Sequence, residues 1–295
     1  SLKELYDLAS KLKISHYTLF ERKELENVIL QECTRQSISI NGDESIDINE
    51  AYVFGLFWAD GTSGYYECKT VRKPKDRPRA YTFTRKSYSW AISNNDITLL
   101  EKAKDILVNL YNFEFKIIEC TTRTENRAYK LIVNGGVKTR EFVEKYTNLF
   151  YYKNKHPRYK NGNKYVPSCI LNASTRVRQN FLEGFYNGDG NGHDIHDASK
   201  NKNFDIEGKI GAQGIFTLCK SLGYLVSLNT RASMPNVFSL SLTKGHQQKN
   251  PNIIKKIVKL GQTFEYVYDL TTKNHHFQGG IGQLIVHNCD GSHIK

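Results

Sequence analysis

The sequence predicts an α+β fold made of a duplicated unit, each copy ordered helix, strand, strand, helix, strand, strand, helix (αββαββα). Three observations predict it. Apolar residues switch between helical and strand spacing in this order twice along the chain. The length of 295 residues suits two modest domains better than one. A glycine-aspartate-glycine pattern closes the first helix of both copies.

The elements of each copy follow from the apolar periodicity and the turn residues. The first copy is expected to contain a helix at 48–59, two strands reaching 92, a helix at 96–111, strands at 113–120 and 129–133, and a helix at 138–149. The second copy, the shorter one, is expected to contain a helix at 175–186, a strand pair around 203–209, a helix at 211–222, strands at 224–229 and 237–243, and a short helix at 252–259. Residues 1–30 look helical, and strands are expected at 263–270 and 283–287.

Charge and cysteine usage restrict the partners and the compartment. The net charge of +12 favours a polyanionic partner such as nucleic acid, with a basic protein of no such role as the alternative. Neither an apolar signal region nor a membrane-spanning run is present. The six cysteines form no C-x-x-C pair, which favours an intracellular reducing compartment, cytoplasm or nucleus.

Basic residues are concentrated in two stretches, 69–86 and 153–178. Prolines in both stretches exclude regular helix, so we expect exposed strands or loops that follow DNA phosphates, or solvated loops as the alternative. The candidate DNA-binding residues are Lys69, Arg72, Lys73, Lys75, Arg77, Arg79, Arg85, Lys86, Lys153, Lys155, Arg158 and Lys160.

The chemistry is expected where the first helix of each copy ends. Both helices place an aspartate five residues after a glycine, Gly55 before Asp60 and Gly184 before Asp189, and a glycine follows each aspartate. An internal glycine destabilises a helix by about 1 kcal/mol, so close backbone packing of the two helices is the expected reason for it. The glycine after each aspartate predicts a left-handed C-cap. Packed helices would bring the two carboxylates together, although an isolated Asp-Gly is more often an ordinary turn.

These segments, together with Lys164-Tyr165-Val166-Pro167 between them, resemble the paired motifs of LAGLIDADG homing endonucleases. The match is imperfect, because Phe57-Trp58 and Tyr186-Asn187-Gly188 depart from the usual residues. The resemblance implies a saddle of two sheets on a long double-stranded DNA site, in a monomer with internal pseudo-twofold symmetry. It implies that Asp60 and Asp189 hold Mg²⁺, with Mn²⁺ able to substitute, and that Lys164 and Lys244 assist, with a DNA-backbone contact as the alternative for Lys164.

The carboxyl end has a different chemistry. In His287-Asn288-Cys289 the side-chain amide nitrogen of Asn288 can attack the main-chain carbonyl carbon of the same residue. This attack forms a succinimide and breaks the peptide bond to Cys289. His287 would protonate the leaving amine, and the Cys289 thiol is a nucleophile for acyl transfer. With the segment around Asp269 and His275, the pattern resembles the C-terminal splicing block of an intein, and His276 is the adjacent alternative to His275.

The intein resemblance implies host protein segments (exteins) as partners. Residues 290–295 resemble part of type IIA DNA topoisomerases. The first fifty residues lack the usual N-terminal nucleophile and the Thr-x-x-His block, so splicing by this chain alone is not expected. The predicted domains are 1–47 (helical arm or joining region), 48–150 (first repeat), 151–256 (linker and second repeat), 257–288 (splicing segment) and 289–295 (start of the host sequence).

We therefore expect an intein-encoded, Mg²⁺-dependent, site-specific homing endonuclease. Two alternatives remain at this point. One is a degenerate DNA-binding or maturase-like module without nuclease activity, and the other is an element whose main activity is cleavage at Asn288.

Overall fold

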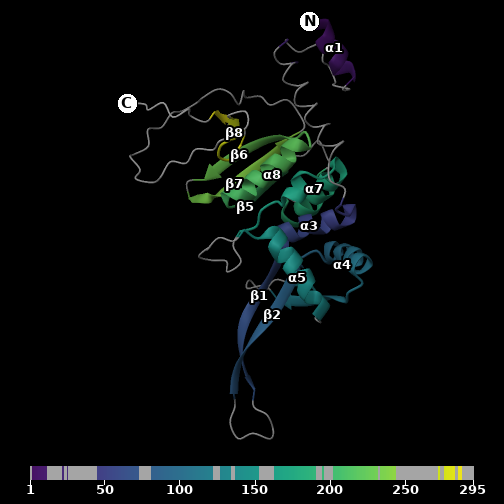
Figure 1. Ribbon diagram of the computed structural model, residues 1–295, viewed down its shortest axis with the longest axis vertical. Helices are drawn as coiled ribbons and strands as arrows, with labels where there is room; N and C mark the ends of the chain where they lie inside the picture. Colours follow the sequence, from purple (N-terminus) through teal and green to yellow (C-terminus); the bar gives the residue numbers. More distant parts are fainter. Residues whose placement is uncertain are drawn as a thin grey trace, which may run out of the picture.

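The computed structural model (Figure 1) describes residues 2–11, 22, 25, 45–72, 81–121, 127–133, 137–152, 163–190, 195, 202–231, 233–243, 272, 276–282 and 285–287. The elements combine helices with three antiparallel sheets, so the predicted α+β class is confirmed. Helix α1 (Leu2–Lys11) confirms part of the helical expectation for residues 1–30. None of the described helices is both long and apolar enough to cross a membrane.

The first unit has the predicted order. It consists of α3 (Ile48–Asp60), β1 (Gly61–Arg72), β2 (Tyr81–Asn94), α4 (Ile97–Tyr111), β3 (Phe115–Thr121), β4 (Arg127–Val133) and α5 (Val137–Phe150). Asp47 begins α3 by accepting hydrogen bonds from the Asn49 and Glu50 amides, and Asp96 begins α4 by accepting from the Thr98 amide. The sheet order is β1-β2-β4-β3.

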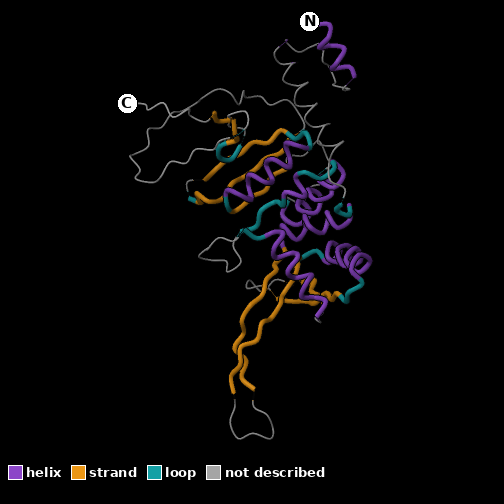
Figure 2. Tube along the Cα trace, viewed as in Figure 1, coloured by secondary structure: helices purple, strands orange, loops and turns teal. Residues whose placement is uncertain are grey.

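Strands β1 and β2 form a ribbon that leaves the body of the protein, as Figure 2 shows. They pair from Gly61 with Ile92 to Arg72 with Tyr81, whereas β4 pairs only with the last part of β2, from Ala91 to Asn94. Most of the ribbon is therefore two-stranded.

The second unit is shorter in the described residues, as expected. It consists of α7 (Thr175–Asp189), β5 (Lys202–Glu207), α8 (Lys209–Ser221), β6 (Leu225–Arg231) and β7 (Met234–Thr243), preceded by the short helix α6 (Ser168–Leu171). Its sheet order is β5-β7-β6, which matches β2-β4-β3 of the first unit. Strand β5 confirms one strand of the pair predicted around 203–209, although α8 already begins at Lys209. Strand β5 pairs with the distant strand β7, and residues 191–194 and 196–201 lie outside the described residues.

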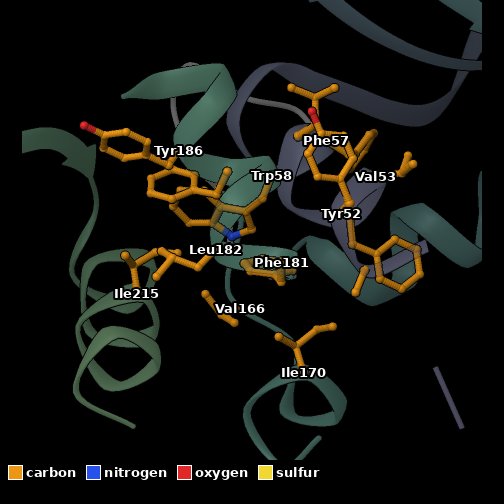
Figure 3. Close-up of a cluster of buried hydrophobic side chains, with 14 of the residues drawn as sticks. Tyr52, Val53, Phe57, Trp58, Val166, Ile170, Phe181, Leu182, Tyr186 and Ile215 are labelled. Carbon is orange, nitrogen blue, oxygen red and sulfur yellow. The ribbon is translucent and has the colours of Figure 1, made fainter. Parts of the chain in front are cut away.

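The two units share one apolar core centred on α3 and α7 (Figure 3). The Trp58 ring of α3 meets the Phe185 ring of α7 edge to face, with centroids 5.0 Å apart. Val166 and Ile215 extend the same cluster toward α8. Because α3 is buried along almost its whole length, it is the central element that both units cover.

The carboxyl-terminal part contains a small hairpin of β8 (His276–Gln278) and β9 (Ile285–His287). Strand β9 confirms the end of the strand predicted at 283–287, and β8 was not predicted. Outside the described residues lie the helix expected at 252–259, the strand expected at 263–270, and Asp269, His275, Asn288 and Cys289.

Candidate active site

The site is built on the contact between α3 and α7. A Cβ added at Gly55 would lie 1.9 Å from the Phe181 carbonyl oxygen, and one at Gly184 would lie 2.0 Å from the Tyr52 carbonyl oxygen. The two helix backbones therefore touch at both glycines, where a Cβ atom would have no room. This is the close packing that the sequence predicted for these glycines.

The two helices end side by side at their aspartates. Helix α3 ends at Asp60 and α7 ends at Asp189. Asp60 Oδ2 lies 3.2 Å from the position that a Cβ on Gly188 would take, so the Asp60 carboxylate rests against the backbone just before Asp189. The carboxylates predicted to meet are thus brought to the same place.

The predicted left-handed caps are wrong. Gly61 has φ −85° and ψ 155°, and Gly190 has φ −79° and ψ 173°, both extended. Glycine is needed there for space: a Cβ at Gly61 would lie 2.2 Å from the Phe57 ring, and one at Gly190 would lie 2.3 Å from the Tyr186 carbonyl oxygen. The chain turns directly out of each helix, with no room for a side chain over its last turn.

A cavity of about 300 Å³ opens beside these helix ends. Residues from both units and from the segment between them line it: Trp58, Ala59, Gly61, Thr62, Tyr151, Asn163, Lys164, Asp189, Asp205, Ile206 and Glu207. Asp60 is fixed next to it by Asn94, whose Nδ2 donates to Asp60 Oδ2 at 2.7 Å.

Burial makes ionisation of both aspartates unfavourable. Burial, together with the negative charges of Asp60 and Asp205, raises the pKa of Asp189 to about 6 against the attraction of Lys164. Burial also raises the pKa of Asp60, opposed by the Asn94 hydrogen bond and by Lys164. Among the described residues at the cavity, the acids Asp60, Asp189, Asp205 and Glu207 face a single lysine, Lys164.

Lys164 lies close enough to both aspartates to interact with their charges, and it holds the end of α3. Its Nζ donates to the Phe57 and Trp58 carbonyl oxygens, both at 2.8 Å. These carbonyls belong to the last turn of α3, where a cation is favourable. Burial lowers the pKa of Lys164 to about 7, opposed by the attraction of Asp60 and Asp189. Since Lys164 also pairs with Tyr151 in an isolated β-bridge, it joins the end of the first unit to the carboxylates.

The donor set suits a hard divalent cation. Mg²⁺ is usually held by one or two carboxylates, and waters and substrate phosphates complete its shell. Asp60 and Asp189 supply such a pair, and a bound cation would favour their ionised forms, which burial disfavours. Among the described residues, no three His, Cys, Asp or Glu side chains form a ready-made cluster for a metal ion. The residues thus fit a cation that takes its other ligands from water and DNA.

The predicted DNA-binding residues are only partly described. Lys69 is exposed on β1, and Arg72, Arg85 and Lys86 belong to the β1–β2 ribbon. The remaining eight lie outside the described residues, as does Lys244.

Asn94, Asp205 and Glu207 belong to the site and were not predicted. No role was predicted for Asn94. Its amide could have been singled out because it ends the strand that runs back toward Asp60 in the first unit. Asp205 and Glu207 carry no comparable signal, since alternating acids on a strand normally indicate an exposed face.

Comparisons with known proteins give one curated relative and several similar structures. No protein-family model matches the chain. A DNA polymerase of Acanthamoeba polyphaga mimivirus is 36% identical to it over 262 residues, which are 87% of this chain and 14% of that polymerase. The chain thus spans only a small part of the relative that it matches.

The similar solved structures are of homing endonucleases. They include I-DmoI in complex with DNA and Mn (18% identity, TM-score 0.43, covering 67% of this chain and 91% of that one). I-WcaI bound to its DNA recognition sequence is 13% identical (TM-score 0.36, covering 71% and 81%). The I-LtrWI LAGLIDADG homing endonuclease bound to target DNA is 14% identical (TM-score 0.34, covering 66% and 78%). These identities are too low to transfer residue roles to this chain.

Proposed function

We propose that this chain is a site-specific, divalent-cation-dependent DNA endonuclease of the LAGLIDADG homing type. The observation that carries the proposal is that Asp60 and Asp189 end two helices that touch at Gly55 and Gly184, beside a cavity shared by both units. Two carboxylates with unneutralised charge at the centre of a basic, duplicated protein suit hydrolysis of a phosphodiester in each DNA strand.

Each residue of the site has a separate task. Asp60 and Asp189 would hold the cation, which when bound makes a water more acidic and stabilises charge on the scissile phosphate. Asn94 fixes the Asp60 carboxylate through its amide. Lys164 holds the last turn of α3 and lies near both carboxylates. Lys244 remains a proposed assisting residue.

Cleavage of an uninterrupted host gene tests the function. We propose that the chain is inserted in a host protein. Its match to 14% of a longer DNA polymerase favours a polymerase as the host, whereas residues 290–295 resemble a type IIA topoisomerase. Plasmids with the uninterrupted polymerase gene and with the uninterrupted topoisomerase gene are tested side by side, and the host gene is expected to be linearised in Mg²⁺ or Mn²⁺ and to stay intact after chelation with EDTA. The matched control is the same plasmid with the coding sequence of this chain inserted, which should resist. Binding without nicking in either metal would instead support the DNA-binding or maturase-like alternative.

The carboxyl-terminal hairpin favours a second activity. Its register sets His276 opposite His287, the residue before Asn288. We propose that this hairpin presents the bond between Asn288 and Cys289 for succinimide formation, with Asp269 and His275 or His276 assisting.

Mass spectrometry tests the second activity. Incubation with an N-terminal intein splicing fragment is expected to remove residues 289–295 from the native chain and to leave Asn288→Ala intact. An unchanged mass of the native chain after long incubation counts against cleavage at Asn288.

A further inference from the structure

The two large sheets have equivalent strands but different outer faces. Strands β5, β7 and β6 correspond in order to β2, β4 and β3. In both sheets every second residue points to the helices, and the residues between them form the outer face. Directly paired residues lie on the same face, so the register defines rows of neighbouring side chains.

The first sheet presents a cationic and apolar outer face. The buried row Ile92, Leu131 and Ile117 identifies its inner side. The two outer rows are Ser93, Lys130 and Ile118, and Ala91, Ile132 and Lys116. Two lysines thus lie on this face, of which Lys116 forms an exposed ion pair with Glu114 at 3.0 Å. The basic β1–β2 ribbon continues from the same sheet.

The second sheet presents a face of short hydrogen-bonding side chains. Its buried row is Phe204 and Leu240 with the half-buried Leu228. The two outer rows are Asp205, Ser239 and Asn229, and Asn203, Ser241 and Ser227. These rows contain no lysine or arginine, and the lysine of strand β5, Lys202, is buried on the inner side.

The two faces suit different parts of DNA. Lysines bind phosphates without regard to sequence, and this binding weakens steeply with salt. Asparagine side chains can bond both edge atoms of adenine, serines can bond several bases, and a carboxylate accepts from the cytosine amino group. Asp205, which accepts a hydrogen bond from Ser239 Oγ, repels phosphates by its charge.

We propose that the two units divide DNA recognition: the first sheet holds the phosphate backbone, and the outer face of the second sheet reads base edges through Asn203, Asn229, Ser239 and Asp205. This rests on the proposed function, because both faces must lie on one DNA duplex. Specificity is then concentrated in the half of the target that the second unit covers, and salt-dependent affinity in the other half.

Binding measurements with two double variants test the division. Fluorescence polarisation measures binding of the full chain, without Mg²⁺, to a labelled duplex of the uninterrupted insertion site. The affinity is measured at several salt concentrations and with duplexes substituted at one base pair at a time. Lys116→Gln with Lys130→Gln is expected to weaken binding to all sequences alike and to lower the slope of log K against log salt by about 1 per lysine. Asn203→Ala with Asn229→Ala is expected to leave that slope unchanged and to lose about 5- to 150-fold discrimination at one or more base pairs of one half-site.

Matched controls come from α4, which packs on the inner side of the first sheet. Lys104→Gln and Asn109→Ala should change neither the slope nor the base preferences, and circular dichroism melting should show all variants folded. The division is overturned if the asparagine variant lowers the salt slope, if it keeps every base preference, or if the lysine variant relaxes base preference instead. Failure of the native chain to bind any duplex would reject the proposed function itself, which is a different result.

Discussion

Gly55→Ala and Gly184→Ala are each expected to lower the free energy of unfolding by at least about 3 kcal/mol. The added Cβ would lie 1.9 Å or 2.0 Å from a backbone carbonyl oxygen of the facing helix, and neither backbone can rotate away as a side chain can. The helices would have to separate along the contact that carries both aspartates, so cleavage should fall with stability. Urea denaturation followed by circular dichroism measures the effect.

Gly223→Ala is the matched control for this prediction. Gly223 has φ +83° with no atom within 4 Å of an added Cβ, so the only cost is that of a left-handed backbone, about 1 kcal/mol. If the Gly55 and Gly184 variants lose no more stability than Gly223→Ala, the helices are not in backbone contact at these positions.

Asp60→Asn and Asp189→Asn are each expected to lower the rate of double-strand cleavage by on the order of 10³-fold or more, because each removes a carboxylate that we propose as a ligand of the cation. A supercoiled plasmid is the substrate for this measurement. Cleavage of both strands makes it linear, cleavage of one strand makes it a nicked circle, and no cleavage leaves it supercoiled. Asp105→Asn, an exposed position on α4, is the control and should cleave normally. Full cleavage by either site variant rules out that aspartate as a ligand.

Asp189→Asn should also stabilise the metal-free protein at neutral pH. The folded pKa of Asp189, about 6, lies above its ordinary value of 3.8, so the ionised carboxylate opposes folding. This penalty develops as the pH rises from about 4 to 6 and is complete above 6. The variant is therefore expected to gain about 1–2 kcal/mol above pH 6 and almost nothing below pH 4. Urea unfolding in EDTA at pH 4 and pH 7.5 compares the stability of the native chain with that of Asp189→Asn. An equal gain in the free energy of unfolding at both pH values would refute a raised pKa as the cause.

The parts of the site that lie on regular, apolar helices could be predicted. The spacing of Gly55 and Asp60, repeated at Gly184 and Asp189, predicts both the close approach and the position of the carboxylates, since one local pattern determines both. The left-handed caps were wrongly predicted because the glycines after the aspartates are required where a Cβ atom would clash, and not where a positive φ is needed. At Gly61 the clash comes from the Phe57 ring, which lies against it in the folded protein. No local sequence pattern predicts the position of that ring.

The parts of the site that come from distant segments could not be predicted. Lys164 was recognised through its resemblance to a motif, but its hydrogen bonds to the end of α3 depend on a partner 106 residues away. Strand β5 likewise pairs with β7, whose partner residues lie 30 to 40 positions later in the chain. Local secondary-structure propensity does not determine which distant strands pair. That pairing depends on which apolar faces are buried against each other in the folded protein.

The α+β class, the order of the elements in the first unit and the two helices that end in aspartate follow from the sequence alone. Apolar periodicity and the spacing of glycine and aspartate are local properties, so they can be recognised without the fold. Tertiary packing brings Asn94, Lys164, Asp205 and Glu207 to these aspartates and gives the two sheets outer faces of different chemistry. Those features depend on which strands pair and on which residues burial removes from water, and both are set by the packing of the whole protein.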